Sequence, residues 1–230
     1  MKYKNVIKAK FITRPNRFIA YCEVDGKIET VHVKNTGRCR ELLTENATVY
    51  LSISDNEERK TKFDLVAVEK QTCRGNLLIN MDSQAPNTAA YEWIKAGGIF
   101  GEGAIVRREV SYGGSRFDLY VEQGDRRAFV EVKGVTLEND GIASFPDAPT
   151  ERGVKHLGEL ATAVKDGYEA YILFVVQMKG VRSFTPNDET HKAFGDALRT
   201  ASANGVNVLA YDCMVKPCEM VIENPISIKL

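Results

Sequence analysis

Three charged residues, Asp118, Glu131 and Lys133, stand among strand-forming residues in the segment RFDLYVEQGDRRAFVEVKG. A two-residue turn at Gly124-Asp125 would place Asp118 directly opposite Glu131, with Cβ atoms about 4.5–5.5 Å apart. Lys133 would share their face, because the side chains of a strand alternate between its two faces. Like charges directly opposed destabilise a sheet, so this arrangement predicts a hard cation such as Mg²⁺ bound to the carboxylate oxygens.

The preceding strand offers a third acid. A turn at Gly113-Gly114 would bring Glu109 opposite Asp118, which makes one row of acids across three strands. The opposite face of the hairpin is expected to be apolar, with Phe117, Leu119, Val121, Val130 and Val132. A structural alternative stays open, in which the two acids pair with neighbouring basic residues such as Arg116 or Lys133, because a D…ExK pattern arises easily by chance in a chain that is 27% charged.

The elements around this hairpin indicate a mixed sheet covered by helices. One helix is expected from Asn87, its N-cap, to Gly97, which ends it. A second helix begins at Thr150 and carries an apolar stripe, and a third spans about 187–204. Strands are expected at about 104–112, 115–122 and 127–137, and at AYILFVV and VNVLAYDC.

The first 80 residues read instead as short strands rich in β-branched and aromatic residues. Asp25-Gly26 suits a type I′ hairpin turn, and GRCRELL (37–43) suits a short helix. Five or six short strands with one small helix predict an OB-like β-barrel. With the boundary near residues 81–86, we expect an OB-like domain at 1–82 and an α/β (α+β) domain at 83–230.

Charge divides the chain in the same way, although the net charge is zero. Residues 1–80 carry 15 basic and 10 acidic residues, and the first 40 alone have a net charge of +7. Barrels of this class bind single strands through basic grooves and aromatic faces. The candidate nucleic-acid contacts are Lys8, Lys10, Arg14, Arg17, Asn35, Thr36, Arg38 and Arg40, interleaved with Tyr3, Phe11, Phe18 and Tyr21. The alternatives are a solvated strand surface for the charges and core packing for the aromatic residues.

A second charged cluster lies at the start of the second helix, in FPDAPTERGVKH. It contains Asp147, Glu151, Arg152, Lys155 and His156. A helix N-terminus attracts phosphate, and Arg152 and Lys155 would strengthen that attraction. His156 could transfer a proton or could be structural.

Several classes of protein are disfavoured by composition. No apolar run is long enough for a transmembrane helix, and the first residues lack the apolar core of a signal peptide. The five cysteines, with no CxxC among them, indicate reduced thiols in a cytoplasmic protein. Three histidines that do not cluster with cysteine argue against a zinc site.

At VKNTGRCREL, SYGGSRFDLYV, FVEVKGVTL and FPDAPTERGVKHLGEL the sequence resembles the sugar fermentation stimulation protein A (SfsA) family, over essentially the whole chain. The D…ExK element is similar to that of PD-(D/E)xK nuclease-like domains. The resemblance implies an N-terminal OB-like domain, a C-terminal PD-(D/E)xK-type domain, DNA binding and a link to sugar-utilisation genes. One departure is Val154, where many members are expected to have a polar residue.

Carried over to this sequence, the resemblance makes Asp118 and Glu131 metal-binding acids and Lys133 the motif lysine, with Val132 as a backbone ligand and Glu92 as a candidate further acid. The chemistry implied is Mg²⁺- or Mn²⁺-assisted phosphodiester hydrolysis. The alternative is a non-cleaving DNA-binding regulator of sugar (maltose) utilisation genes. A sugar binder ranks third, because no segment reads as a sugar pocket. Exposed sheet edges would permit a homodimer.

Overall fold

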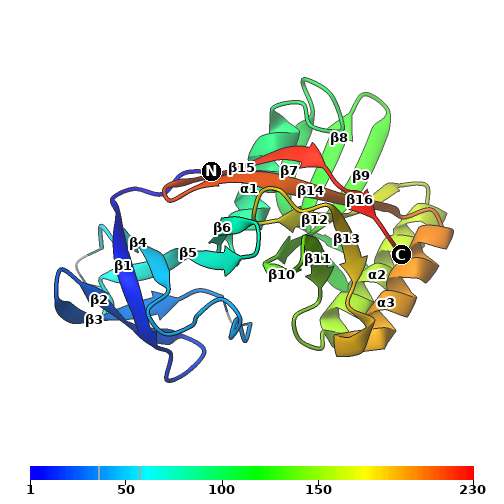
Figure 1. Cartoon of the computed structure of the whole chain (residues 1–230). Coiled ribbons are helices and arrows are strands. Elements are labelled where there is room, and N and C mark those ends of the chain that lie inside the picture. The colour runs from blue at the N-terminus through cyan, green and yellow to red at the C-terminus, as the bar shows by residue number, and fades with distance from the viewer. Residues whose placement is uncertain (36, 57) are drawn as a thin grey trace.

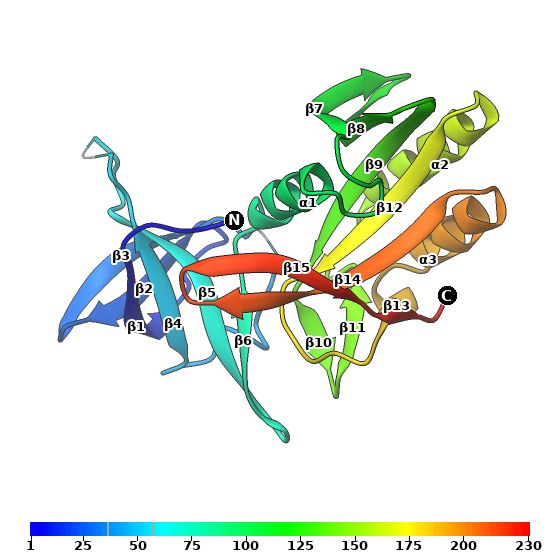
Figure 2. The same cartoon turned by 90° about the horizontal axis from the view of Figure 1, so that it is seen from above.

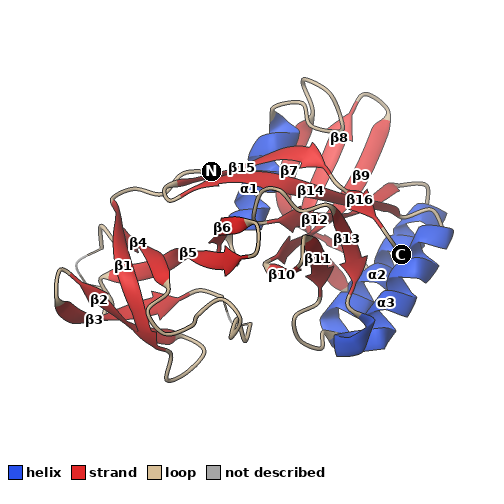
Figure 3. Cartoon of the chain, viewed as in Figure 1, coloured by secondary structure: helices blue, strands red, loops and turns tan. Residues whose placement is uncertain are grey.

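The computed structural model of the chain describes residues 1–35, 37–56 and 58–230. Among the residues described, the first 80 contain strands, turns and loops but no helix, and the helices α1, α2 and α3 lie in the remainder (Figures 1 and 3). The strands of the first part are β1 (Val6–Thr13), β2 (Ile19–Val24), β3 (Lys27–Val33), β4 (Thr48–Ile53), β5 (Phe63–Thr72) and β6 (Gly75–Asn80).

The first part is a closed barrel. Its strands run in the order β3-β2-β1-β4-β5, and a parallel pairing of β3 with β5 closes the circle, while β6 pairs with β5 outside it. Inward positions of β1 and β2 alternate with exposed ones, as a barrel wall requires. The OB-like barrel is therefore confirmed. The type I′ turn is confirmed as well, because Val24 pairs with Lys27 around residues with φ of 49° and 76°.

The short helix expected at 37–43 is wrong. This segment forms turns, in which the amides of Leu42 and Leu43 both donate to the carbonyl of Cys39. Cys39 has a φ of 45°, in the left-handed region, and such a residue interrupts a right-handed helix.

The second part has more elements than the sequence indicated. They are α1 (Ala85–Lys95), β7 (Ile105–Tyr112), β8 (Ser115–Gln123), β9 (Arg126–Val135), β10 (Leu137–Asn139), β11 (Ile142–Phe145), α2 (Glu151–Lys165), β12 (Glu169–Val176), β13 (Ser183–Pro186), α3 (Asp188–Ala203), β14 (Asn207–Lys216), β15 (Glu219–Pro225) and β16 (Ser227–Ile228). The four short strands β10, β11, β13 and β16 form a separate sheet. Strands of two to four residues are too short to show a period of two in the sequence.

The main sheet of this part is mixed, in the order β15-β14-β12-β9-β8-β7. The central strand β12 is parallel to both β9 and β14 and is buried along almost its whole length. Helix α1 covers one face, and α2 and α3 cover the other (Figure 2). The mixed sheet flanked by helices is thus confirmed, with the β8–β9 hairpin between the two helical layers.

The helix ends explain where the polar residues near the hairpin point. Thr150 caps α2, because its side chain accepts a hydrogen bond from the amide of Gly153 at 3.1 Å. The prediction of Asn87 as a cap is wrong: α1 begins at Ala85, with Pro86 in its first turn, where a missing amide costs nothing. Asn87 therefore lies inside the helix, and its side chain is free to reach the sheet.

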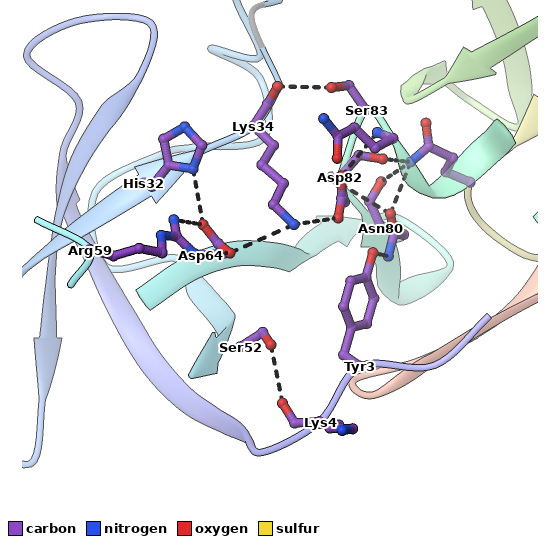
Figure 4. Close-up of polar contacts among 12 residues, drawn as sticks. Tyr3, Lys4, His32, Lys34, Ser52, Arg59, Asp64, Asn80, Asp82 and Ser83 are labelled. Atoms are coloured by element: carbon purple, nitrogen blue, oxygen red, sulfur yellow. Dashed lines mark hydrogen bonds and ion pairs between the residues drawn. The ribbon is translucent and has the colours of Figure 1, made fainter. Parts of the chain in front are cut away.

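A group of charged side chains with two buried acids, Asp64 and Asp82, joins the two parts (Figure 4). The ammonium of Lys34, just after β3, lies 3.1 Å from Asp82 and 3.6 Å from Asp64. Burial raises the pKa of Asp64, but hydrogen bonds from Arg59 and His32 outweigh it and lower the pKa to about 2. Asp64 is thus ionised, and Lys34 links the barrel to the residues that lead into α1.

All five cysteines are free thiols, and Cys22, Cys39 and Cys213 are buried. None of the helices described is both long and apolar enough to cross a bilayer.

Candidate active site

The β8–β9 hairpin has the expected register. Leu119 pairs with Val130 and Gln123 with Arg126, around a turn at Gly124-Asp125. The ladder ends at Leu119, so Asp118 lies just beyond the last pair. From there its Oδ2 accepts a hydrogen bond from the amide of Val132 at 2.7 Å. The predicted neighbourhood of Asp118 and Glu131 is thus present, although not as a regular cross-strand pair.

Phe117 lies on the other face of the sheet from the one that the sequence predicted. The sequence predicted Phe117 on the apolar face with Leu119, and this is wrong. Phe117 packs in the other core cluster, with its ring 5.3 Å from Phe129 and 6.0 Å from His156. Phe117 still pairs with Val110 of β7, but that pairing is interrupted at Glu109 and the β8–β9 ladder has already ended. The regular alternation of faces is therefore broken between Phe117 and Leu119.

Asp118 is held between α1 and β9. Its Oδ1 accepts a hydrogen bond from the Asn87 side chain at 2.7 Å, opposite the bond from Val132. Burial and the neighbouring charge of Glu131 raise the pKa of Asp118 to about 6, despite these donors. Burial contributes most to the raised pKa and the charge of Glu131 adds to it, while the charge of Lys133 offsets only part of the rise.

Glu131 is only 2% exposed, and its two oxygens have different surroundings. Oε1 lies 2.5 Å from both His156 Nδ1 and Lys133 Nζ. Oε2 is buried and has no hydrogen-bond partner. Burial raises the pKa of Glu131, but the hydrogen bond from His156 and the charge of Lys133 outweigh it, so that the pKa is lowered.

These observations test whether the pair fits a divalent cation. The buried carboxylate of Glu131 has an unpartnered oxygen, and the half-buried carboxylate of Asp118 beside it has a raised pKa. Mg²⁺ is commonly held by one or two carboxylates, with water or substrate oxygens completing its shell. Asp118 and Glu131 fit this pattern. Val132 lies beside them through its amide.

The two other predicted acids have different partners. Glu109 is half-exposed and forms an ion pair with Arg116 at 2.8 Å. The register on either side is the expected one, with Arg108 opposite Leu119 and Val110 opposite Phe117, but Glu109 itself has a φ of 57° and interrupts the pairing. Glu92 lies 2.7 Å from the N-terminal amine. Within residues 1–35, 37–56 and 58–230, no group of three or more His, Cys, Asp or Glu residues is arranged to hold a metal ion.

The structure joins part of the second cluster to the first. His156 is buried against Glu131, and Arg152 Nε donates to His156 Nε2 at 3.3 Å. Lys155 instead donates to the carbonyl of Gly114 at 2.8 Å, and the exposed Glu151 lies 3.2 Å from His191. Asp147 packs against Gly37 of the barrel, where a Cβ would collide with its carboxylate.

The basic residues of the barrel fall into two groups. Arg14 is half-buried, and its guanidinium donates to four backbone carbonyls at 2.6–3.2 Å, those of Arg17, Asn35, Gly37 and Arg38. It therefore fastens two loops together. Exposed Arg17, Arg38 and Arg40 border a surface pocket of about 680 Å³.

The remaining nucleic-acid candidates are more scattered. Lys8 and Lys10 are exposed on β1. Asn35 accepts from the amide of Gly37 at 2.8 Å, and Thr36 lies outside the described residues. Among the aromatic candidates, Phe18 (57% exposed) and Tyr21 (38% exposed) are on the surface, while Phe11 is core.

Asn87 is the site residue that the sequence did not reveal as such. It stands 31 positions before Asp118, and no spacing rule connects a helix residue to a strand partner at that distance. Its amide was interpreted as a helix cap, and only the packing of α1 on the sheet brings it to the carboxylate.

Comparison with known proteins covers both parts of the chain. The family model "SfsA N-terminal OB domain" matches residues 12–80, and "Sugar fermentation stimulation protein RE domain" matches residues 84–219. The chain belongs to the SfsA family. The sugar fermentation stimulation protein homolog of Clostridium beijerinckii is 58% identical over 215 residues, which cover 94% of this chain and 93% of the relative. That of Desulfitobacterium hafniense strain Y51 is 55% identical over 230 residues, which cover 100% and 99%.

A solved structure is similar along the full length. The structure of Pyrococcus furiosus SfsA in complex with Ca²⁺ has a TM-score of 0.89 and 26% identity, and the match covers 100% of this chain and 98% of that one. The overall fold is thus shared with that SfsA protein.

Proposed function

We propose that this SfsA protein binds DNA and carries, in its second part, a Mg²⁺- or Mn²⁺-dependent site for phosphodiester hydrolysis. The observation that carries the proposal is the pair of carboxylates at Asp118 and Glu131, with the unpartnered Oε2 of Glu131 beside it and Lys133 next along the strand. The Ca²⁺ in the structure of the Pyrococcus furiosus relative supports a divalent-cation site in this chain. We expect the protein to act in the cytoplasm.

The residues of the chain have distinct parts in this reaction. Asn87 and the amide of Val132 hold the two oxygens of Asp118 in place. The Lys133 ammonium, only 16% exposed, neutralises Glu131 and would donate to a phosphate oxygen as negative charge develops there. A divalent ion supplies Lewis-acid polarisation of the phosphate and acidifies a water molecule.

DNA binding is supported by the surface of the barrel. Arg17, Arg38 and Arg40 are exposed around one pocket, and Phe18 on the same barrel is exposed as a stacking surface. Arg14 contributes by holding the loops that carry these residues. We therefore expect Arg17, Arg38 and Arg40, rather than Arg14, to contact phosphate.

A supercoiled-plasmid nicking assay tests the cleavage function. We expect the wild-type protein to nick DNA with Mg²⁺ or Mn²⁺ and to lose this activity with EDTA or with Asp118→Asn. Glu109→Gln is the matched control, since it removes an acid from the same sheet that is half-exposed and paired with Arg116. Nicking that persists in Asp118→Asn, or without a divalent ion, would place the reaction elsewhere.

A gel-shift titration tests DNA binding separately. Glutamate in place of Arg17, Arg38 and Arg40 is expected to weaken binding and to reduce its dependence on salt, because fewer counterions are released. Affinity that is independent of salt, or unchanged by the three substitutions, would rule out this surface.

A second candidate, DNA binding without cleavage by a regulator of sugar (maltose) utilisation genes, is favoured by one observation. Lys133 already supplies a positive charge to Glu131, and the described part of the chain adds no third acid or histidine in a metal-binding arrangement. Binding that survives EDTA, with no nicking under any metal condition, would support this candidate.

A further inference from the structure

Both ring nitrogens of His156 are engaged. Nδ1 lies 2.5 Å from Glu131 Oε1, and Arg152 Nε donates to Nε2 at 3.3 Å. Because a guanidinium can only donate, Nε2 carries the lone pair and Nδ1 carries the proton that goes to Glu131. The ring is 4% exposed and has no free lone pair for a substrate proton. His156 therefore acts on Glu131 and not on a reacting group.

The contact makes the two oxygens of Glu131 unequal. Oε1 accepts from His156 and from Lys133, which uses the two in-plane lone pairs of a carboxylate oxygen. Oε2 accepts from no group in the described chain, although it is buried. A cation that binds Glu131 without displacing these donors has only Oε2 available.

We propose that His156 is a positioning residue that limits Glu131 to one-oxygen coordination of a divalent cation, and so favours Mg²⁺ or Mn²⁺ over Ca²⁺. The inference rests on the proposed cation site at Asp118 and Glu131. Mg²⁺ has a compact octahedral shell with few protein ligands, whereas Ca²⁺ takes six to eight oxygens and often binds a carboxylate through both. Loss of the His156 donor would free a lone pair on Oε1 and allow Glu131 to bind through both oxygens.

The test is calorimetric titration of the metal-free full-length protein with MnCl₂ and, separately, with CaCl₂. Partners outside the coordination shell typically contribute about 10–100-fold to metal affinity. We expect His156→Leu, which keeps most of the volume but has no donor, to weaken Mn²⁺ binding by about 10-fold or more while Ca²⁺ binding changes less. His156→Asn, which retains an amide donor near the Nδ1 position, should keep the wild-type Mn²⁺/Ca²⁺ ratio within about 3-fold.

Two further variants complete the design. His191→Gln is the matched control, because His191 is also largely buried near the start of α2 but contacts Glu151 and the amide of Thr150. Arg152→Ala removes the exposed outer partner of His156 and should shift the ratio in the same direction by a smaller factor. It also tests the contact if His156→Leu does not fold, as judged by circular dichroism.

The outcomes separate this inference from the proposed function. Cation binding that needs Asp118, with an Mn²⁺/Ca²⁺ ratio unchanged in both His156→Leu and Arg152→Ala, overturns the role of His156 and leaves the cation site standing. If His156→Leu does not fold, an unchanged Mn²⁺/Ca²⁺ ratio in Arg152→Ala is enough to overturn the role of His156. Wild-type protein that binds neither ion overturns the site and this inference together.

Discussion

Asp118→Asn should stabilise the metal-free protein above pH 6. Burial and the charge of Glu131 raise the pKa of Asp118 from an ordinary value of 3.8 to about 6. At about 1.4 kcal/mol for each tenfold change in proton affinity, ionised Asp118 destabilises the fold by up to about 3 kcal/mol. An asparagine carries no charge, and its amide oxygen can still accept from Val132 while its NH₂ group faces Asn87, whose own amide can rotate to accept.

The sign of the pH dependence follows from the direction of the shift. A carboxyl with a raised pKa in the folded state is most favourable to folding below its unfolded pKa, and that contribution is lost as the pH rises through about 6. The advantage of Asp118→Asn over wild type should therefore be about 1–3 kcal/mol at pH 8 and should vanish near pH 4.

Thermal unfolding in EDTA at a series of pH values measures this difference. For a chain of this size, each kcal/mol corresponds to about 2–4 °C in Tm. Glu109→Gln, which alters an exposed acid, should show no comparable gain. Addition of MgCl₂ at pH 8 should raise the Tm of wild type but not that of Asp118→Asn. An asparagine variant that is no more stable than wild type at pH 8, or whose advantage does not depend on pH, would refute the reasoning.

Three further predictions concern the surroundings of the site. Lys34→Met removes the ammonium between Asp64 and Asp82 (Figure 4) and leaves Asp82 buried without a cation. We expect the free energy of unfolding, measured in urea, to fall by about 2–3 kcal/mol. An unchanged unfolding midpoint would contradict this. Gly134→Ala places a Cβ 2.5 Å from Gln177 Oε1 and should destabilise the fold by about 1–3 kcal/mol. Gly158→Ala, whose Cβ meets open space on α2, should stabilise it by up to about 1 kcal/mol. Equal effects of the two substitutions on Tm would count against the packing argument. Arg14→Leu should lower the Tm because four carbonyls lose their donor, and Arg17→Leu should weaken DNA binding with little change in Tm; the reverse pattern would disprove the division of these arginines.

Much of the fold could be predicted because local signals agree with the final structure. The barrel strands, the turn at Asp25-Gly26, the cap at Thr150 and the buried strand β12 each depend on residues that are close in sequence. The small sheet of β10, β11, β13 and β16 was missed because its strands are very short and, apart from the β10–β11 hairpin, pair with segments far along the chain. The turn segment at 37–43 was misread because a helical pattern of apolar residues carries no information on the left-handed φ of Cys39.

The candidate site divides in the same way. The sequence by itself determined that Asp118 and Glu131 come together, since the length of one hairpin turn sets which residues are neighbours across two strands. It did not determine the surroundings of those acids. Asn87 from α1 and His156 from α2 reach the pair from opposite faces of the sheet, and Glu109 turns to Arg116 at a local break in the pairing. Such contacts depend on how helices pack on a sheet and on where a ladder ends, which are properties of the whole domain rather than of spacing along the chain.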